Sequence, residues 1–241
     1  AALLVGFIAR LLGRWLGFLP GKLYPSARDK SPSEAKGDFW CIAIQRQYGC
    51  GGREIGKQLA DKLGWNYYDS DLIRIAAGTT GLPEELVEEK EEGLTGSLLF
   101  DLLHSMEGYG GQKTSPQDQI FQAEAQAIRE FAARGNCVIV GRCGDFVLRD
   151  HENCLRVFLH GAPGIRAERL TKTEGLSLQQ AEEKLHREGR RRGEHYRYYT
   201  HNVWGLASNY HLTVDTGLGL DFARQEILAA LKQKQSQAKG S

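Results

Sequence analysis

The residues with the clearest chemical meaning are the glycines that follow a short apolar run near position 42. The chain reads IAIQRQYGCGGREIG from residue 42 to residue 56, so Gly49, Gly51 and Gly52 stand between a strand-like segment and a helix-like segment. Glycines let consecutive backbone N–H groups turn toward one anion, and the start of a helix adds positive electrostatic potential there. This order of strand, glycine loop and helix is typical of a phosphate-binding loop.

The loop lacks the strict pattern G-x-x-x-x-G-K-[ST] of nucleotide-binding P-loops. A near-match runs from Gly51 to Lys57, but it leaves only residues 58–63 for the helix before Gly64. If the loop ends at Gly52 instead, the following helix places its apolar side chains on one face. We favour this second register on packing grounds, and it directs Lys57 to solvent. The apolar face then consists of Ile55, Leu59, Ala60 and Leu63.

Arginines supply the second chemical signal, because phosphoryl transfer requires positioning and positive charge more than covalent chemistry. Arg142 follows the apolar run 137–141, at the predicted carboxyl end of a strand, where open α/β sheets bind ligands. A structural alternative for Arg142 is an ion pair with Asp145 or Asp150. Residues 184–197 hold six Lys or Arg and two Glu, a net charge of +4. This stretch is either a lid over phosphates, a solvated basic helix, or a patch that stacks on RNA bases.

Composition limits the possible classes of protein. The chain has 241 residues, a formal net charge of +1 and 41% hydrophobic residues, values typical of one medium-sized globular domain. A nearly neutral chain argues against general nucleic-acid binding, so no nucleic-acid partner is expected. Five cysteines without a Cys-x-x-Cys pair predict free thiols and a cytoplasmic location, and no metal site is expected from the side chains.

Short apolar runs alternate with helical patterns from residue 39 onward. This alternation predicts an α/β fold with a parallel sheet covered on both faces. The predicted strands are 40–44, 66–69, 137–141, 155–160 and 211–215, and the predicted helices are 53–63, 71–77, 116–134, 165–172, 177–199 and 220–232. We expect one domain over residues 39–235, followed by a disordered tail at residues 236–241.

Residues 1–38 are expected to form an N-terminal extension. Residues 1–19 are apolar but contain Arg10 and Arg14, and the segment before Arg10 is too short to span a bilayer. Two interpretations remain open: an interfacial amphipathic helix with weak membrane contact, or an extension that packs on the domain or is poorly ordered. Residues 20–38 are rich in Pro, Ser, Gly and charge, which is typical of a linker.

Several segments, in the same order along the chain, resemble the cytidylate kinase-like family. The segment RQYGCGGREIGKQLADKLGWNYYD carries the arginine–glutamate form of the phosphate-binding loop found in that family. The resemblance continues over CVIVGRCGDFVLRD, LRVFLHGAPGIRAERL, HREGRRRGEHYRYYT and NYHLTVDT, and it spans about residues 39–232. It implies a three-layer α/β/α P-loop NTPase fold with a five-stranded parallel sheet, strand order 2-3-1-4-5, and a helical lid.

The resemblance also implies roles for individual residues. Gly52 and Glu54 stand where nucleoside monophosphate kinases carry the loop lysine and a hydroxyl that contacts Mg²⁺. Either Arg53 or Arg46 would supply the missing charge, and Glu54 either contacts Mg²⁺ or binds no ligand. Asp145 is a substitute for a cytosine-reading aspartate that this chain replaces with Cys143. The expected cofactor-binding residues are Tyr48, Gly49, Cys50, Gly51, Gly52, Arg53, Glu54, Arg187 and Arg191. The expected catalytic residues are Arg53, Arg142 and Arg192, and the expected substrate-binding residues are Asp69, Arg74, Arg142 and Asp145.

Together these features predict an ATP- and Mg²⁺-dependent phosphotransferase that acts on CMP, dCMP or a related small phosphorylated acceptor. The main alternative is a nucleotide-binding or regulatory protein without kinase activity, because the loop lacks both the lysine and the hydroxyl. Two further alternatives are a membrane-associated regulator that uses residues 1–19 and an RNA-binding protein that uses residues 184–197.

Overall fold

The computed structural model describes residues 39–78 and 115–239 of the chain. By its internal contacts the chain divides into two units, Ala1–Lys36 and Gly37–Ser241, and all described residues belong to the second unit. The predicted N-terminal extension, including the segment 1–19 considered for membrane contact, lies outside the described residues. Within the described part of the chain, no helix has the length and apolar character needed to cross a membrane.

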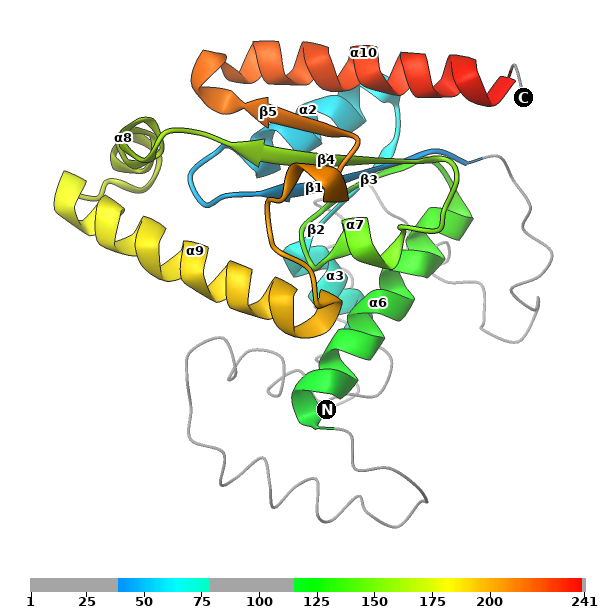
Figure 1. Cartoon of the computed structure of the whole chain (residues 1–241), viewed down its shortest axis with the longest axis horizontal. Coiled ribbons are helices and arrows are strands. Elements are labelled where there is room, and N and C mark those ends of the chain that lie inside the picture. The colour runs from blue at the N-terminus through cyan, green and yellow to red at the C-terminus, as the bar shows by residue number, and fades with distance from the viewer. Residues whose placement is uncertain (1–38, 79–114, 240–241) are drawn as a thin grey trace, which may run out of the picture. The chain divides into compact units, whose positions relative to one another are not determined.

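Five parallel strands form one sheet in the order β2-β3-β1-β4-β5, which confirms the predicted topology (Figure 1). The central strand β1 (Cys41–Arg46) is apolar from Cys41 to Ile44, because helices cover both faces of the sheet there. It continues past the predicted end at Ile44 and brings Arg46 to the carboxyl edge. The other strands are β2 (Asn66–Asp69), β3 (Cys137–Val140), β4 (Cys154–His160) and β5 (Leu212–Asp215).

Alternate residues of β1 face two separate hydrophobic cores. On one face, α2 (Gly52–Leu63) and α10 (Leu220–Lys239) pack against a core that includes Ile42 and Ile44. On the other face, α3 (Ser70–Gly78) and α6 (Pro116–Arg134) pack against a core that includes Cys41 and Ala43, near the short α7 (Gly144–Val147). The three layers confirm the predicted α/β/α class (Figure 1).

A third, smaller core joins α8 (Pro163–Glu174) to α9 (Leu178–Thr200). Ala167 and Leu170 of α8 cluster with Ala181 and Leu185 of α9, and Tyr48 from the glycine loop packs against them. Figure 1 shows α8 next to the carboxyl end of β4, with α9 following it. The basic segment 184–197 is therefore part of a long helix whose packing holds it beside the glycine loop.

The carboxyl-terminal helix is longer than the sequence pattern predicts. α10 runs to Lys239, so the predicted disordered tail is wrong for residues 236–239, which are helical. Ala223, Ile227 and Leu231 are buried and hold the helix on the sheet. Its polar end is rich in Gln, Lys and Ala, which are strong helix formers even without packing.

Candidate active site

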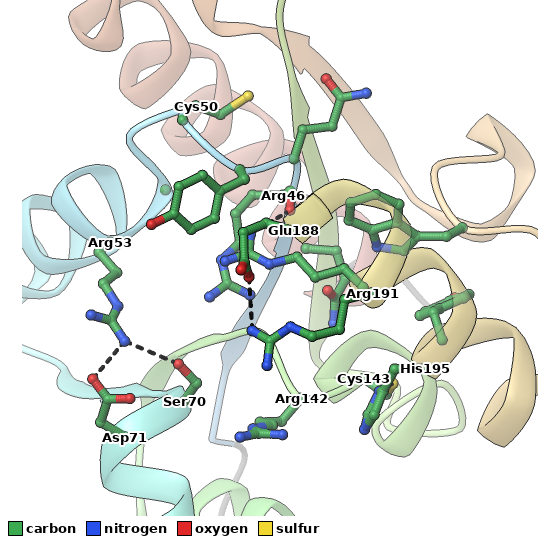
Figure 2. Close-up of a pocket in the computed structure, with 18 of the residues that line it drawn as sticks. Arg46, Cys50, Arg53, Ser70, Asp71, Arg142, Cys143, Glu188, Arg191 and His195 are labelled. Atoms are coloured by element: carbon green, nitrogen blue, oxygen red, sulfur yellow. Dashed lines mark hydrogen bonds and ion pairs between the residues drawn. The ribbon is translucent and has the colours of Figure 1, made fainter. Parts of the chain in front are cut away.

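A cleft of about 960 Å³ opens at the carboxyl edge of β1 and β3. Its walls come from the glycine loop, the start of α3, one face of α6, the end of α8 and the middle of α9. Figure 2 shows side chains from these separate segments gathered around one space. The predicted site residues that line the cleft are Tyr48, Gly49, Cys50, Gly51, Gly52, Arg53, Glu54, Arg74, Arg142, Arg191 and Arg192.

The glycine loop needs its glycines for both conformation and space. Gly49 and Gly51 have φ angles of +80° and +71°, in the left-handed region that other residues rarely adopt. A Cβ atom on Gly49 would lie 3.0 Å from Cβ of Arg166, and one on Gly51 would lie 2.9 Å from Cζ of Arg169. Arg166 also donates a hydrogen bond of 3.1 Å to the carbonyl oxygen of Tyr48. The two arginines of α8 therefore brace the loop from outside.

The first backbone amides of α2 are available to an anion. The helix begins at Gly52, its predicted apolar face is buried, and Lys57 is exposed, so the favoured register of the loop is confirmed. No side chain caps the first amides of α2, whereas α6 and α9 begin with capping boxes from Ser115 and Ser177. Since Gly51 and Gly52 line the cleft, an anion bound there would accept hydrogen bonds from these amides.

Positive charge is concentrated in the same cleft. The guanidinium groups of Arg46, Arg53, Arg142 and Arg192 come from four different segments and all line it. Burial, together with the charges of Arg192 and Arg53, lowers the pKa of Arg46 to about 9, so the group stays charged at neutral pH. Burial also lowers the pKa of Arg192. These cations raise one another's energy unless an anion lies among them.

Arg142 is aimed into the cleft by an unusual turn at the end of β3. Both Arg142 and Cys143 have positive φ angles, 49° and 52°. Such a conformation costs free energy in residues with a side chain and is found where function requires it. The guanidinium Nε lies 3.3 Å from Oε1 of Glu124, which is buried in α6. The pair holds the arginine in place against the floor of the cleft.

Arg53 and Glu54, at the start of α2, are both engaged in ion pairs. Arg53 contacts Asp71 at 2.5 Å and Ser70 at 3.2 Å, and Figure 2 shows it extended toward these two residues of α3. Asp71 also contacts Arg74 at 2.7 Å. Burial acts to raise the pKa of Asp71, but hydrogen bonds and charge from the two arginines lower it below its usual value. Glu54 pairs with Arg169 of α8 and does not cap the helix.

Two predicted site residues are directed elsewhere. Asp69 accepts hydrogen bonds of 3.1 Å from the backbone amides of Asp71 and Leu72, so its carboxylate caps the start of α3. Arg187 is 67% exposed at its side chain and contacts Glu188 at 3.6 Å. It lies outside the cleft because α9 buries the opposite side of its surface against α8. Neither residue is among those that line the cleft, although Oδ2 of Asp69 lies 3.7 Å from Nε of Arg53, which does line it.

The cleft also has an aromatic wall, in which Phe121 of α6 is a residue that the sequence analysis missed. The rings of Phe121 in α6 and Tyr199 in α9 stack with centroids 4.0 Å apart, and His195 lies edge-on to Tyr199 at 4.8 Å. Cys143 Sγ lies 3.7 Å from Nδ1 of His195. Burial raises the pKa of the Cys143 thiol, which favours the protonated form. Only the packing of α6 beside α9 brings these rings together.

Asp145, which the sequence analysis expects to bind substrate, lies in the interior of the domain. It is 2% exposed and accepts a hydrogen bond of 2.7 Å from the hydroxyl of Tyr196 in α9. Burial raises the pKa of Asp145, and the bond from Tyr196 offsets this only in part. The carboxyl group therefore links α7 to the lid helix and does not line the cleft.

Asp145→Asn is expected to change the pH dependence of stability. Because the pKa of Asp145 is higher in the folded than in the unfolded chain, the unfolded chain holds fewer protons between the two values, and stability falls as the pH rises through that range. Asparagine keeps an acceptor for Tyr196 without the charge. We therefore expect the free energy of unfolding of the variant, relative to the unaltered protein, to increase as the pH rises above about 4, the value for an aspartate in the unfolded chain. Urea unfolding at several pH values measures this difference, and a constant or falling difference would contradict the prediction.

A family model described as the cytidylate kinase-like family matches the chain over residues 41–218, well over half of its length. The chain belongs to the cytidylate kinase-like family. The match runs from β1 to the end of the short 3₁₀ helix Thr216–Leu218 that follows β5. It therefore includes the glycine loop, Arg142 and the whole of α9, which confirms the resemblance inferred from the sequence motifs. Among curated proteins, none matches this chain.

Solved structures with a similar fold include proteins of the P-loop kinase type. An uncharacterized protein from Eubacterium ventriosum ATCC 27560 superposes with a TM-score of 0.61 at 20% identity, covering 80% of this chain and 98% of that chain. A gluconokinase from Sinorhizobium meliloti 1021 superposes with a TM-score of 0.50 at 17% identity, covering 84% of this chain and 97% of that chain. At these identities the similarity establishes the kinase-like fold and no shared substrate.

Proposed function

We propose that this member of the cytidylate kinase-like family is an ATP-dependent phosphotransferase that phosphorylates CMP, dCMP or a related small phosphorylated acceptor. The observation that carries the proposal is the meeting of three separate segments in one cleft: the glycine loop, Arg142 after β3, and Arg192 of α9. Backbone amides and cations placed around one space are what phosphoryl transfer asks of a protein.

The amides at the start of α2 would bind the triphosphate, and Arg142 would orient the phosphate of the acceptor. An oxygen of the acceptor phosphate attacks the γ-phosphorus of ATP. The new P–O bond forms as the bond from the γ-phosphorus to the β–γ bridging oxygen breaks, and ADP leaves. Arg192 is placed on the lid side of the cleft and would stabilise the charge that spreads over the transferred group in the transition state.

The carboxylates of the cleft fit a Mg²⁺ ion that arrives with the triphosphate. Among the described residues, no group of three or more His, Cys, Asp or Glu side chains is placed to hold a metal without help. Mg²⁺ in phosphoryl-transfer sites takes one or two carboxylates together with phosphate oxygens and water. Glu54 and Asp71 line the cleft and are the carboxylates that would hold the ion, which requires each to give up a present ion pair with an arginine. When bound, it would neutralise part of the negative charge of the phosphates.

The aromatic wall supports an acceptor that carries a base. Phe121, Tyr199 and His195 present ring surfaces on the α6 side of the cleft, next to Arg142 and Glu124. Rings at this position favour a flat aromatic group through stacking. A nucleoside monophosphate combines such a group with a phosphate for Arg142, whereas a small sugar acid offers no ring to stack.

The alternative of nucleotide binding without phosphoryl transfer rests on a specific contact. Glu54 stands where the hydroxyl that contacts Mg²⁺ is expected, and it is tied to Arg169 by an ion pair. The RNA-binding alternative has less support, because Arg190 and Arg191 of α9 pair with Glu194 and Glu188 on the same helix.

A coupled assay of ADP release separates these functions. We expect turnover with Mg-ATP and CMP or dCMP, and lower rates with UMP, AMP and non-nucleotide acceptors such as gluconate. Calorimetric binding of ATP without turnover for any acceptor would favour the non-catalytic alternative. No binding of ATP would overturn both.

Arg142→Lys is expected to weaken acceptor binding without loss of folding. Lysine keeps a positive charge beside the buried Glu124 but lacks the planar fork that binds a phosphate through two hydrogen bonds. We expect the KM for the acceptor to rise about tenfold, the loss of one charge-assisted hydrogen bond, while the Kd for ATP stays unchanged. Arg149→Lys is the matched control, because Arg149 pairs with Asp150 outside the cleft. An equal effect of both substitutions would contradict the role of Arg142.

A further inference from the structure

Arg46, at the end of β1, and Gly52, at the start of α2, have the opposite residue types to those of the general P-loop pattern. When G-x-x-x-x-G-K-[ST] is laid on residues 46–53, its second glycine falls on Gly51. Its first glycine then falls on Arg46 and its lysine falls on Gly52. The chain therefore has a cation where the pattern has a glycine, and a glycine where the pattern has its cation.

The two exchanged positions are in contact. A Cβ atom on Gly52 would lie 2.8 Å from Cγ of Arg46, so the arginine stem occupies the space that a longer residue at position 52 would need. On its other side, a Cβ atom on Gly141 would lie 2.3 Å from Nη1 of Arg46. The arginine side chain thus passes between two glycines from different segments to reach the cleft. A change at either glycine would displace it.

Arg46 is buried but has no carboxylate to balance it. It is 8% exposed, and among the described residues no carboxylate oxygen lies within ion-pair distance of its guanidinium group. Arg53 and Arg142, in the same cleft, pair with Asp71 and Glu124. A buried charge without a partner is costly, and a folded protein keeps one where a ligand supplies the opposite charge.

The neighbours of Arg46 increase this cost. Arg192 donates a hydrogen bond of 3.1 Å to the carbonyl oxygen of Arg46, which holds a second guanidinium group near the first. Arg192, Arg53 and Arg142 all act to lower the pKa of Arg46. An anion with several negative oxygens, bound among these groups, would remove the repulsion.

Arg53 is the weaker candidate for the missing cation of the loop. Its side chain is 55% exposed and is committed to Asp71 and Ser70 at the start of α3. A cation that is exposed and already paired gains little from a phosphate. Arg46 is only 8% exposed and has no carboxylate partner among the described residues.

We propose that Arg46 takes the place of the P-loop lysine, and that its guanidinium group, delivered between Gly52 and Gly141, binds the terminal phosphates of the nucleoside triphosphate. This inference rests on the proposed function, because it assigns the cation that holds the triphosphate in the same cleft. In this arrangement the cation that binds the phosphates comes from the end of β1 and not from the first turn of α2. β1 extends to Arg46, two residues beyond its predicted end, and so brings this side chain to the cleft.

Calorimetric titration of the full chain with inorganic tripolyphosphate tests the role of Arg46. We expect Arg46→Gln to lower tripolyphosphate affinity by about tenfold to hundredfold, the loss of charge-assisted hydrogen bonds. Without ligand, the variant is expected to melt at the same or a higher temperature, because a buried unpaired charge is removed. A purely structural role for Arg46 predicts a lower melting temperature instead. Lys57→Gln on the exposed side of α2 is the matched control and is expected to bind as the unaltered protein does.

Restoring the general pattern supplies a second, independent test. Gly52→Lys alone is expected to lose tripolyphosphate affinity, because the new side chain meets Arg46. The double variant Arg46→Gly/Gly52→Lys is expected to bind tripolyphosphate more tightly than Arg46→Gly. Removal of the Arg46 side chain leaves room for a lysine at position 52, where the general pattern has its lysine. A double variant no better than Arg46→Gly would overturn the inference.

The outcomes separate this inference from the proposed function. If the unaltered protein turns over ATP and Arg46→Gln binds tripolyphosphate equally well, the inference fails and the proposed function stands. If the unaltered protein binds neither ATP nor tripolyphosphate, both fail.

Discussion

Replacing Arg192 by alanine is expected to lower kcat by about 10³-fold or more, the range found when an arginine that stabilises a phosphoryl-transfer transition state is removed. Arg192 reaches the glycine loop from α9, where its guanidinium group lies 4.9 Å from the centre of the Tyr48 ring and bonds to the carbonyl oxygen of Arg46. These contacts hold it on the α9 side of the proposed triphosphate site. Rates at saturating Mg-ATP and acceptor measure the effect on the chemical step.

Arg190→Ala is the matched control on the same helix. Arg190 lies outside the cleft, has a 73% exposed side chain and pairs with Glu194, so the control is expected to retain activity. The melting temperature of both variants shows whether α9 stays docked on α8. A loss of less than tenfold for Arg192→Ala, with α9 still docked, would contradict a role for this arginine in the transition state.

Gly141→Ala is expected to destabilise the fold by about 2 to 5 kcal/mol, because it combines backbone strain with overpacking. Gly141 has a φ angle of +93°, which an alanine adopts at a cost. Its new Cβ atom would also lie 2.3 Å from Nη1 of Arg46, in a region where the chain is closely packed. Because the arginine must move, we also expect at least a tenfold loss of affinity for tripolyphosphate.

Gly64→Ala separates the two causes. Gly64 also has a left-handed backbone, with a φ angle of +67°, but a Cβ atom there would meet nothing within 4 Å. Gly64→Ala is expected to lower the free energy of unfolding by about 1 kcal/mol and to leave the affinity for tripolyphosphate unchanged. Urea unfolding gives the two stabilities, and calorimetry gives the two affinities. Equal stability losses for both variants would show that the contact with Arg46 contributes nothing.

The elements that carry the site follow from local sequence patterns. Residues 116–134 are helical as predicted, and Asn66–Asp69 forms the predicted strand, because period and capping are properties of neighbouring residues. The glycine loop and the position of Arg142 after a strand follow from the same kind of pattern. The order of the strands came from the family resemblance, since alternating strands and helices are compatible with several parallel orders.

The partners of the charged residues do not follow from such patterns. Arg187, Arg191 and Arg192 belong to one basic run, yet only the last two line the cleft, because the packing of α9 on α8 sets which side of the helix faces inward. Asp145 is close to Arg142 in sequence, but it points into the interior and bonds to Tyr196. The rotation of a helix about its own axis decides which of its side chains face the cleft. That rotation depends on packing contacts with residues that are distant in the sequence.

The sequence by itself determined the strand, loop and helix that form the proposed anion site, and the family to which the chain belongs. Tertiary structure alone decided which arginine stands in the site without a counter-charge. Arg46 meets Gly141 only when β1 and β3 pair, and Arg53 meets Asp71 only when α2 and α3 flank the same sheet edge. Charge pairing acts over a few ångströms in space, and distance in space is not a local property of the chain.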